Sequence, residues 1–259
     1  MLTLSLASLY PYVNHYFWPC LRILALLGTA PIFSEKQINA RIKIALALVS
    51  TFLIAPQLPD TGIAIASLDG LMAGCQQLII GIAIGFSVQL IFVAVRHAGE
   101  LVGMQMGLSM AMVYDPSGGT NMPVVARLLN LCVTLLFLVF NGHLYLLEVV
   151  ASSFNAFPVS AAPMGATGMM EIVREGRMIF QYGFMLGLPV ITLLLCLNLT
   201  LGLLNRLTPQ LSIFIVGFPV SLTVGMVAMS LVMYTLAPFF ENMMAGIFDT
   251  LFIILKGFG

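Results

Sequence analysis

The feature that most constrains this chain is a series of long apolar runs that contain no charged residue. Leu71 to Val95 has no charged side chain in about 25 residues, and an α-helix needs roughly 20 to cross a bilayer. Of the 259 residues, 60% are apolar and 8% are charged, whereas soluble domains carry roughly 25% charged residues. In water such a chain would expose large apolar patches and aggregate. The sequence therefore predicts an integral membrane protein.

Six hydrophobic segments divide the chain and predict an all-α, multi-pass membrane protein with about six hydrophobic helices. They are Tyr10–Phe33, Ile44–Leu58, Leu71–Val95, Leu128–Leu147, Met178–Leu204 and Leu211–Phe240. The loop Ser34–Lys43 is the densest in cations, so the positive-inside rule places it in the cytoplasm. That orientation puts the N-terminus outside.

The charge pattern and the scattered reactive side chains argue against several functions. Ten basic and ten acidic residues give a net charge of zero without a basic stripe, so no footprint for nucleic acid is present. The four cysteines and three histidines are widely spaced, which does not support a metal or redox centre. We find no GxSxG, HExxH or phosphate-binding loop. We therefore expect no enzyme activity, no catalytic residue, no metal site and no cofactor.

Arg22 is the ionisable residue that fits its surroundings least. It lies in the middle of an apolar run, whereas Arg127 and Arg206 lie at the ends of segments, where long side chains reach the headgroups. Ionisable residues within membrane segments are functional candidates and need a partner. An acidic side chain from another segment or another subunit is one such partner; Glu100 and Asp115 are candidates between which the sequence does not choose.

One stretch fits neither a membrane-spanning helix nor an ordinary loop. Residues 96–113 mix polar side chains with an uncharged part of about 13 residues, which is typical of re-entrant or interfacial segments. Gly99, Gly103 and Gly107 share one helical face, where they favour either routine helix packing or close approach of another subunit. The turn sequence Tyr114–Asn121 follows. Irregular backbone at membrane depth must be buried or line a cavity, so this stretch either lies outside the bilayer or lines a passage.

Several motifs, in order along the chain, resemble the FliR family. They are Ala98–Glu100, Gln105–Ala111, Asp115–Pro116, Asn141–His143, Gly202–Gln210 and Phe214–Pro219, with Ala30–Phe33 and Arg41–Lys43 nearer the start. The resemblance covers essentially the whole chain. The injectisome counterpart of the family shares the plan, but residues 105–111 and 205–210 are closer to the flagellar pattern.

The resemblance implies a subunit of the type III secretion export gate at the flagellar basal body, in the bacterial inner membrane. Its partners would be FliP and FliQ, with FlhB and FlhA alongside, and its substrates would be unfolded flagellar proteins. Residues 1–187 would form a FliP-like part, and residues 188–259 would form a FliQ-like helical hairpin with the C-terminal helix.

The resemblance also implies a plug at residues 106–122, a loop that closes the pore before secretion. The residues that match it are Met106, Gly107, Leu108, Ser109, Met110, Asp115, Pro116 and Met122. The residues expected to pack against other subunits are Gly99, Gly103, Gly107, Arg206, Pro209 and Gln210. Glycine and proline allow the loop to be displaced, and methionine offers adaptable apolar packing, so the composition suits a deformable seal.

Three other functions stay open on the sequence alone. The same fold in an injectisome would secrete virulence effectors. A small-molecule or ion transporter is a second alternative, but such proteins often contain internal repeats and midplane ionisable groups, and we find no clear repeat. A membrane scaffold that shapes a ring without gating it is the third.

Overall fold

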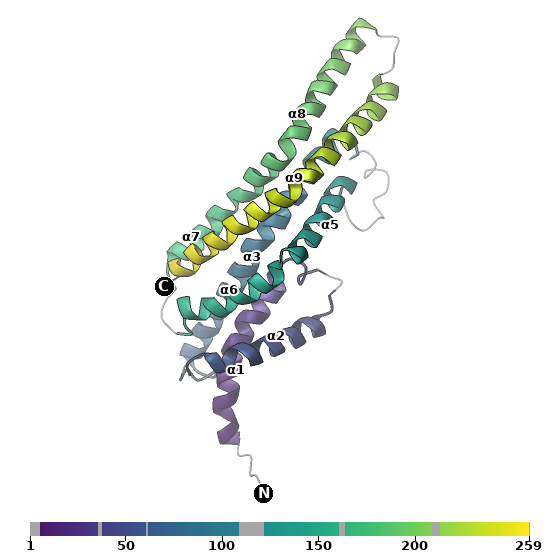
Figure 1. Cartoon of the computed structure of the whole chain (residues 1–259). Coiled ribbons are helices and arrows are strands. Elements are labelled where there is room, and N and C mark those ends of the chain that lie inside the picture. The colour runs from purple at the N-terminus through teal and green to yellow at the C-terminus, as the bar shows by residue number, and fades with distance from the viewer. Residues whose placement is uncertain are drawn as a thin grey trace. The chain divides into compact units, whose positions relative to one another are not determined.

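The regular elements of the chain are helices. The computed structural model describes residues 6–35, 38–60, 62–108, 122–160, 164–208 and 213–258. Within these ranges the helices are α1 (Leu6–Thr29), α2 (Ala40–Ile54), α3 (Leu68–Gln105), α5 (Val124–Val139), α6 (Gly142–Ala156), α7 (Ala166–Glu175), α8 (Arg177–Leu207) and α9 (Ile213–Gly257), with a short 3-10 helix, η1 (Ala55–Gln57) (Figure 1). The prediction of an all-α protein is confirmed.

Several of these helices are membrane-spanning in length and composition. Within the described part of the chain, four stretches qualify: Ala40–Gln57, Leu68–Gln105, Ala166–Leu207 and Gly217–Gly257. Helices α5 and α6 add a fifth if the pair forms one bent span. The expected segment Tyr10–Phe33 does form a helix, α1, but it is not among these stretches. The chain is therefore an all-α membrane protein with four or five spans in its described part.

Helix α3 is longer than a bilayer requires. Its 38 residues extend roughly 57 Å at 1.5 Å per residue, against a hydrocarbon core of about 30 Å. The expectation that residues 96–113 form a separate re-entrant or interfacial segment is wrong for Arg96 to Gln105, which are the last turns of α3. These residues contain no proline, so nothing in them breaks the backbone hydrogen bonds of the helix.

The expected span Leu128–Leu147 is divided into α5 and α6. Asn141 lies between them with φ 56° and ψ 29°, in the left-handed region that a helix interior excludes. Its carbonyl accepts hydrogen bonds from the backbone N–H groups of Leu144 and Tyr145, which starts α6. Asparagine tolerates the left-handed conformation better than most residues do, so the break is encoded at this position.

The chain forms two compact units. Unit 1 comprises Met1–Gln89, Asn141–Glu175 and Gly246–Gly259, and unit 2 comprises Leu90–Phe140 and Gly176–Ala245. The backbones of α3 and α9 therefore each contribute to both units. The expected division at residue 187 concerns likeness to two other proteins and stays a prediction.

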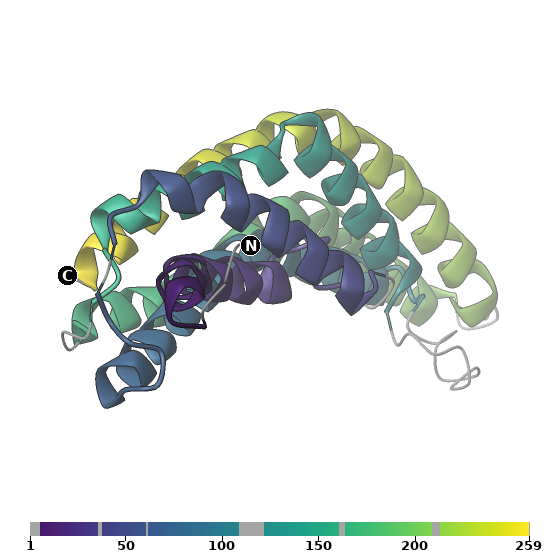
Figure 2. The ribbon, with the colours of Figure 1, turned by 90° about the horizontal axis from the view of Figure 1, so that it is seen from below.

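In unit 1, α1 packs closely against α2 and the first half of α3. Figures 1 and 2 show α2 crossing α1, which Figure 2 views nearly along its axis. On α3, a Cβ atom added at Gly81 would lie 2.7 Å from Cβ of Ala25, and one added at Gly85 would lie 2.9 Å from the carbonyl oxygen of Leu26. Real Cβ atoms do not approach so closely, so these two glycines set the distance between α1 and α3.

In unit 2, α8 and the adjoining part of α9 form an antiparallel pair. The two helices run side by side in Figure 1. Near their connection, a Cβ atom added at Gly217 would lie 3.8 Å from Leu201 Cδ1. Further along, the ring centroids of Tyr182 and Phe239 are 6.0 Å apart. Because residue numbers rise on one helix as they fall on the other, the helices form a hairpin.

Candidate functional site

The guanidinium of Arg22 is fully buried in unit 1 and is bound by two segments that are distant in the sequence, α3 and the end of α6. Nε of Arg22 donates to Oε1 of Gln77 in α3 at 2.7 Å, and Nη1 donates to Oγ of Ser153 in α6 at 2.8 Å. Nη2 donates to the carbonyl oxygen of Phe157, just after α6, at 2.9 Å. The Cζ atom lies 3.9 Å from the ring centroid of Phe154, which adds a cation–π contact.

These partners are all neutral. Among the described residues Arg22 makes no salt bridge, so the considered pairing with Glu100 has no counterpart there. The other candidate, Asp115, lies outside the described residues. A planar guanidinium holds its N–H donors in a fixed geometry, which matches three acceptors contributed by α3 and by the end of α6. We infer that Arg22 fixes the packing of α1 against α3 and α6.

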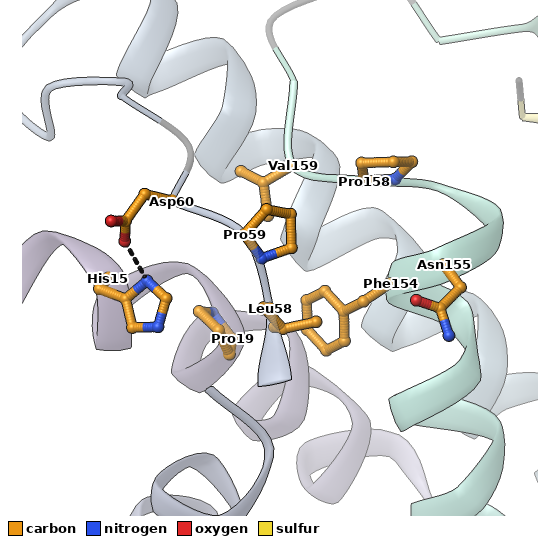
Figure 3. A pocket seen from close by; sticks show the side chains of 9 residues that line it. All are labelled: His15, Pro19, Leu58, Pro59, Asp60, Phe154, Asn155, Pro158 and Val159. Atoms are coloured by element: carbon orange, nitrogen blue, oxygen red, sulfur yellow. Dashed lines mark ion pairs between the residues drawn. The ribbon is translucent and has the colours of Figure 1, made fainter. Parts of the chain in front are cut away.

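A cavity of about 350 Å³ lies in the same unit, and Figure 3 shows the side chains that line it. It is lined by His15, Pro19, Leu58, Pro59, Asp60, Phe154, Asn155, Pro158 and Val159. The ring of Phe154 that contacts Arg22 therefore also forms part of the cavity wall. Most of the lining is apolar, and three prolines contribute to it.

Two polar residues of the lining, His15 and Asp60, form an ion pair. Figure 3 shows His15 and Asp60 facing each other, with 2.7 Å between Nδ1 of His15 and Oδ1 of Asp60. The other ring nitrogen of His15, Nε2, lies 2.7 Å from the carbonyl oxygen of Ala55. The pair thus holds the residues after η1 to α1. Among the described residues, no cluster of three or more histidine, cysteine or acidic side chains could hold a metal ion.

The first residues of the expected plug form the C-terminal cap of α3. The N–H of Gly107 donates to the carbonyl of Met104 at 3.0 Å, and the N–H of Leu108 donates to the carbonyl of Gly103 at 3.0 Å. Gly107 has φ 80°, in the left-handed region. This pair of hydrogen bonds is a Schellman motif, in which glycine is preferred because it has no Cβ atom.

The same cap packs against α9 within unit 2. Met106 has no exposed surface. A Cβ atom added at Gly225 would lie 2.7, 2.8 and 2.9 Å from Cγ, Cε and Sδ of Met106, so this side chain occupies the space that glycine leaves open. At Gly107, an added Cβ atom would lie 3.1 Å from Cδ2 of Phe218. Phe218 and Gly225 are seven residues apart and therefore share one face of α9.

The glycine face expected to contact other subunits has neighbours within the chain. A Cβ atom added at Gly99 would lie 2.5 Å from Cα of Ala126 in α5, and one added at Gly103 would lie 3.1 Å from Cβ of Pro123. These glycines therefore allow close packing of α3 against α5 and the residue before it. Their role, and that of Gly107, in contacts with other subunits stays a prediction.

The remaining expected site residues are placed in part. Ser109, Met110, Asp115, Pro116, Pro209 and Gln210 lie outside the described residues. Met122 is half-buried just before α5, and Arg206 is exposed near the end of α8. Sequence reasoning missed Gly225, although Gly217, Ser221 and Gly225 recur every four residues, which is the small-residue pattern of close helix contacts.

Comparison with known proteins gives consistent matches along most of the chain. The family model for bacterial export proteins, family 1, matches residues 13–247. The chain is 49% identical to the flagellar biosynthetic protein FliR of Pectobacterium carotovorum subsp. carotovorum over 255 residues, which cover 98% of each chain. It is 48% identical to the protein of the same name from Escherichia coli (strain K12), covering 95% of this chain and 94% of that relative. The Bacillus subtilis (strain 168) relative is 24% identical over 95% of both chains.

Proposed function

The chain belongs to the FliR family of flagellar export proteins, and we propose that it is one subunit of the gate that passes unfolded flagellar proteins across the bacterial inner membrane. In this proposal it assembles with FliP and FliQ, with FlhB and FlhA alongside, at the flagellar basal body. The observation that carries the proposal is the match to flagellar relatives over nearly the full length of both chains. The family's description as export proteins agrees with a role other than that of an enzyme.

The assignment of the two parts of the chain to a FliP-like and a FliQ-like role rests on the same resemblance to the FliR family. Residues 1–187 would take the place of a FliP-like subunit, and residues 188–259 would take that of the FliQ hairpin. Two features support the second assignment: α8 and α9 are long and apolar, and within residues 188–259 they are in contact near their connection, where a Cβ atom added at Gly217 would lie 3.8 Å from Leu201 Cδ1. A hairpin of this kind exposes apolar side chains on its outer surface, including Leu199 and Leu203, which suits contact with lipid or with further helices.

Residues 106–122 would close the pore before secretion. The support within the described residues is that α3 ends in a cap at Met106–Leu108, so the segment starts from a fixed point. Deleting Ser109–Thr120 should raise the ion leak through the assembled complex while leaving the cap in place. An unchanged leak in a complex with normal subunit ratios would contradict the gating role.

The first test of the proposal is deletion of the gene in its host, followed by measurement of motility and filament export. Tagged wild-type protein is purified from the same strain and probed for FliP and FliQ. Loss of filaments together with co-purification supports the proposal. Normal filaments with lost delivery of effectors into host cells would move the chain to the injectisome branch, and neither defect would favour a transporter.

A further inference from the structure

We propose that His15 and Asp60 form a proton-binding clasp on the outer side of the membrane, which ties the residues after α2 to α1 when it is protonated and releases them when it is not. Nδ1 of His15 lies 2.7 Å from Oδ1 of Asp60, and Nε2 lies 2.7 Å from the carbonyl oxygen of Ala55. All three residues belong to unit 1. The proposal concerns this unit alone and does not depend on the export role proposed above.

The geometry of the clasp fixes how many protons it holds. A carbonyl oxygen only accepts hydrogen bonds, so Nε2 of His15 must donate to Ala55. An ionised carboxylate also only accepts, so Nδ1 must donate to Asp60, and the ring is then an imidazolium. If Asp60 is instead protonated and donates to Nδ1, the pair has the same number of protons. In either form the pair holds one proton more than a neutral imidazole beside a carboxylate.

The surroundings of His15 favour this extra proton. Ala55 directly follows α2, at the end where the helix dipole is negative, and α2 has no basic residue in its last turn. Of the titratable residues on α1, Tyr16 meets the His15 ring edge-on at 5.6 Å, and Arg22 is two turns further along, with its guanidinium held by neutral partners. The facing part of the cavity wall, from residues 154–159, contains no ionisable side chain. Asp60 is therefore the charged group that the ring faces.

Loss of the proton breaks the clasp at Asp60. A neutral imidazole has one N–H group, so one of its nitrogens would direct a lone pair at an acceptor. The carboxylate of Asp60 is 90% exposed and can turn to water, whereas the Ala55 carbonyl is fixed by a hydrogen bond from the N–H of Leu58. The remaining proton of His15 therefore stays on Nε2, and Asp60 is released. Because Leu58, Pro59 and Asp60 form one wall of the cavity, this wall loosens as the pH rises (Figure 3).

The position of the clasp indicates which solution it senses. The positive-inside rule places the cationic loop Ser34–Lys43 in the cytoplasm. The stretch Ala40–Gln57 is long and apolar enough to cross the membrane once, so Asp60 then lies on the outer side. The clasp would respond to the pH of the outer solution, in the range of about pH 5 to 8 in which histidine changes its charge.

Thermal unfolding of the detergent-solubilised full chain tests the extra proton. Trp18, one turn after His15 on α1, reports the unfolding midpoint through its emission. Asp60→Asn keeps the contact without the extra proton, because its amide N–H donates to a neutral Nδ1. The midpoint of wild type should fall by about 2–4 °C more than that of Asp60→Asn between the acid and alkaline ends of the histidine range. His143→Gln, at a half-buried histidine of α6, is the matched control and should behave as wild type. Equal falls in wild type and Asp60→Asn would overturn the proposal.

Thiol labelling in cells tests the release and the side of the membrane. With the four native cysteines replaced by serine, Leu58→Cys reports on the cavity wall, and Ala66→Cys, exposed in the same connection, is the matched control. A membrane-impermeant maleimide is added outside, and the ratio of the two labelling rates cancels the effect of pH on thiol reactivity. From about pH 6 to about pH 8 this ratio should rise several-fold, and with Asp60→Asn it should stay constant. A constant ratio with Asp60 present would overturn the release, and failure to label Ala66→Cys would overturn the outer location.

Discussion

Replacing Arg22 with leucine tests whether the buried network holds unit 1 together. Arg22 makes three hydrogen bonds, of 2.7, 2.8 and 2.9 Å, to Gln77, Ser153 and Phe157. Hydrogen bonds to a charged group contribute about 1.5–3 kcal/mol each, so their sum is roughly 5–9 kcal/mol. The Arg22→Leu variant no longer buries a charge, and the desolvation cost that it avoids offsets several kcal/mol of this loss. We expect a net loss of about 3 kcal/mol, or roughly 10 °C in the apparent unfolding midpoint.

The chain contains its own probe for this change. Its single tryptophan, Trp18, is one helical turn before Arg22 on the same face of α1, is buried, and lies with Cζ3 3.7 Å from the position of a Cβ atom at Gly74 in α3. Thermal unfolding of the detergent-solubilised protein, followed by tryptophan emission, therefore reports on the contact between α1 and α3. The Arg22→Leu variant should show an emission that shifts to longer wavelength at a lower temperature than wild type.

Two further variants make the result decisive. Arg22→Lys keeps the charge but replaces the planar guanidinium with a compact ammonium, so its unfolding midpoint should lie between those of wild type and Arg22→Leu. Arg127→Leu removes an exposed arginine and should change the midpoint little. A midpoint of Arg22→Leu within about 2 °C of wild type would mean that the free energy of unfolding changes by roughly 1 kcal/mol or less. In that case the network does not hold these helices together and the reasoning fails.

Two further substitutions test the packing at glycines. Gly81→Ala places a methyl group against α1, 2.7 Å from Ala25 Cβ, so the unfolding midpoint followed by tryptophan emission should fall by several degrees. Gly28→Ala is the control, because its methyl group meets nothing within 4 Å and should not lower the midpoint. Gly107→Ala forces a side chain into a φ of 80° beside Phe218 and should cost about 1–2 kcal/mol, measured as a lower temperature for loss of the monodisperse peak in size exclusion. An unchanged profile would show that the α3 cap rearranges freely.

The class of fold could be predicted from the sequence because apolar runs identify membrane spans directly, but two helix boundaries were predicted wrongly. Arg96 marks the end of an uncharged run, and that change in polarity is not a signal that ends a helix; α3 continues to Gln105 because its backbone hydrogen bonds are not interrupted. Asn141, in contrast, ends α5 within an apolar run through its left-handed conformation. The polarity of the side chains indicates where the surroundings change from lipid to water, whereas the backbone conformation indicates where a helix stops.

The site was harder to predict because it depends on contacts between distant residues. Arg22 could be singled out as a buried charge, but its partners Gln77, Ser153 and Phe157 lie 55, 131 and 135 residues away, and none is acidic. A search for a complementary charge therefore does not find the partners that Arg22 has among the described residues, and Asp115 lies outside them. Gly225 belonged to a visible small-residue pattern, but the pattern does not say which side chain packs against this glycine.

These contacts explain how so uniformly apolar a chain specifies its packing. In a soluble protein the buried face of a helix differs from the exposed face in polarity, but here Leu199 and Leu203 are exposed while Leu194 is buried. A helix of this composition gains little from polarity in choosing which face meets its neighbour. The glycines supply that choice, because helices approach most closely where Cβ atoms are missing, and the Arg22 network adds polar contacts between α1, α3 and α6. We therefore expect conservative changes at exposed leucines to be tolerated, and a single methyl group at a position such as Gly81, whose close neighbours are backbone and Cβ atoms of α1, to be disruptive.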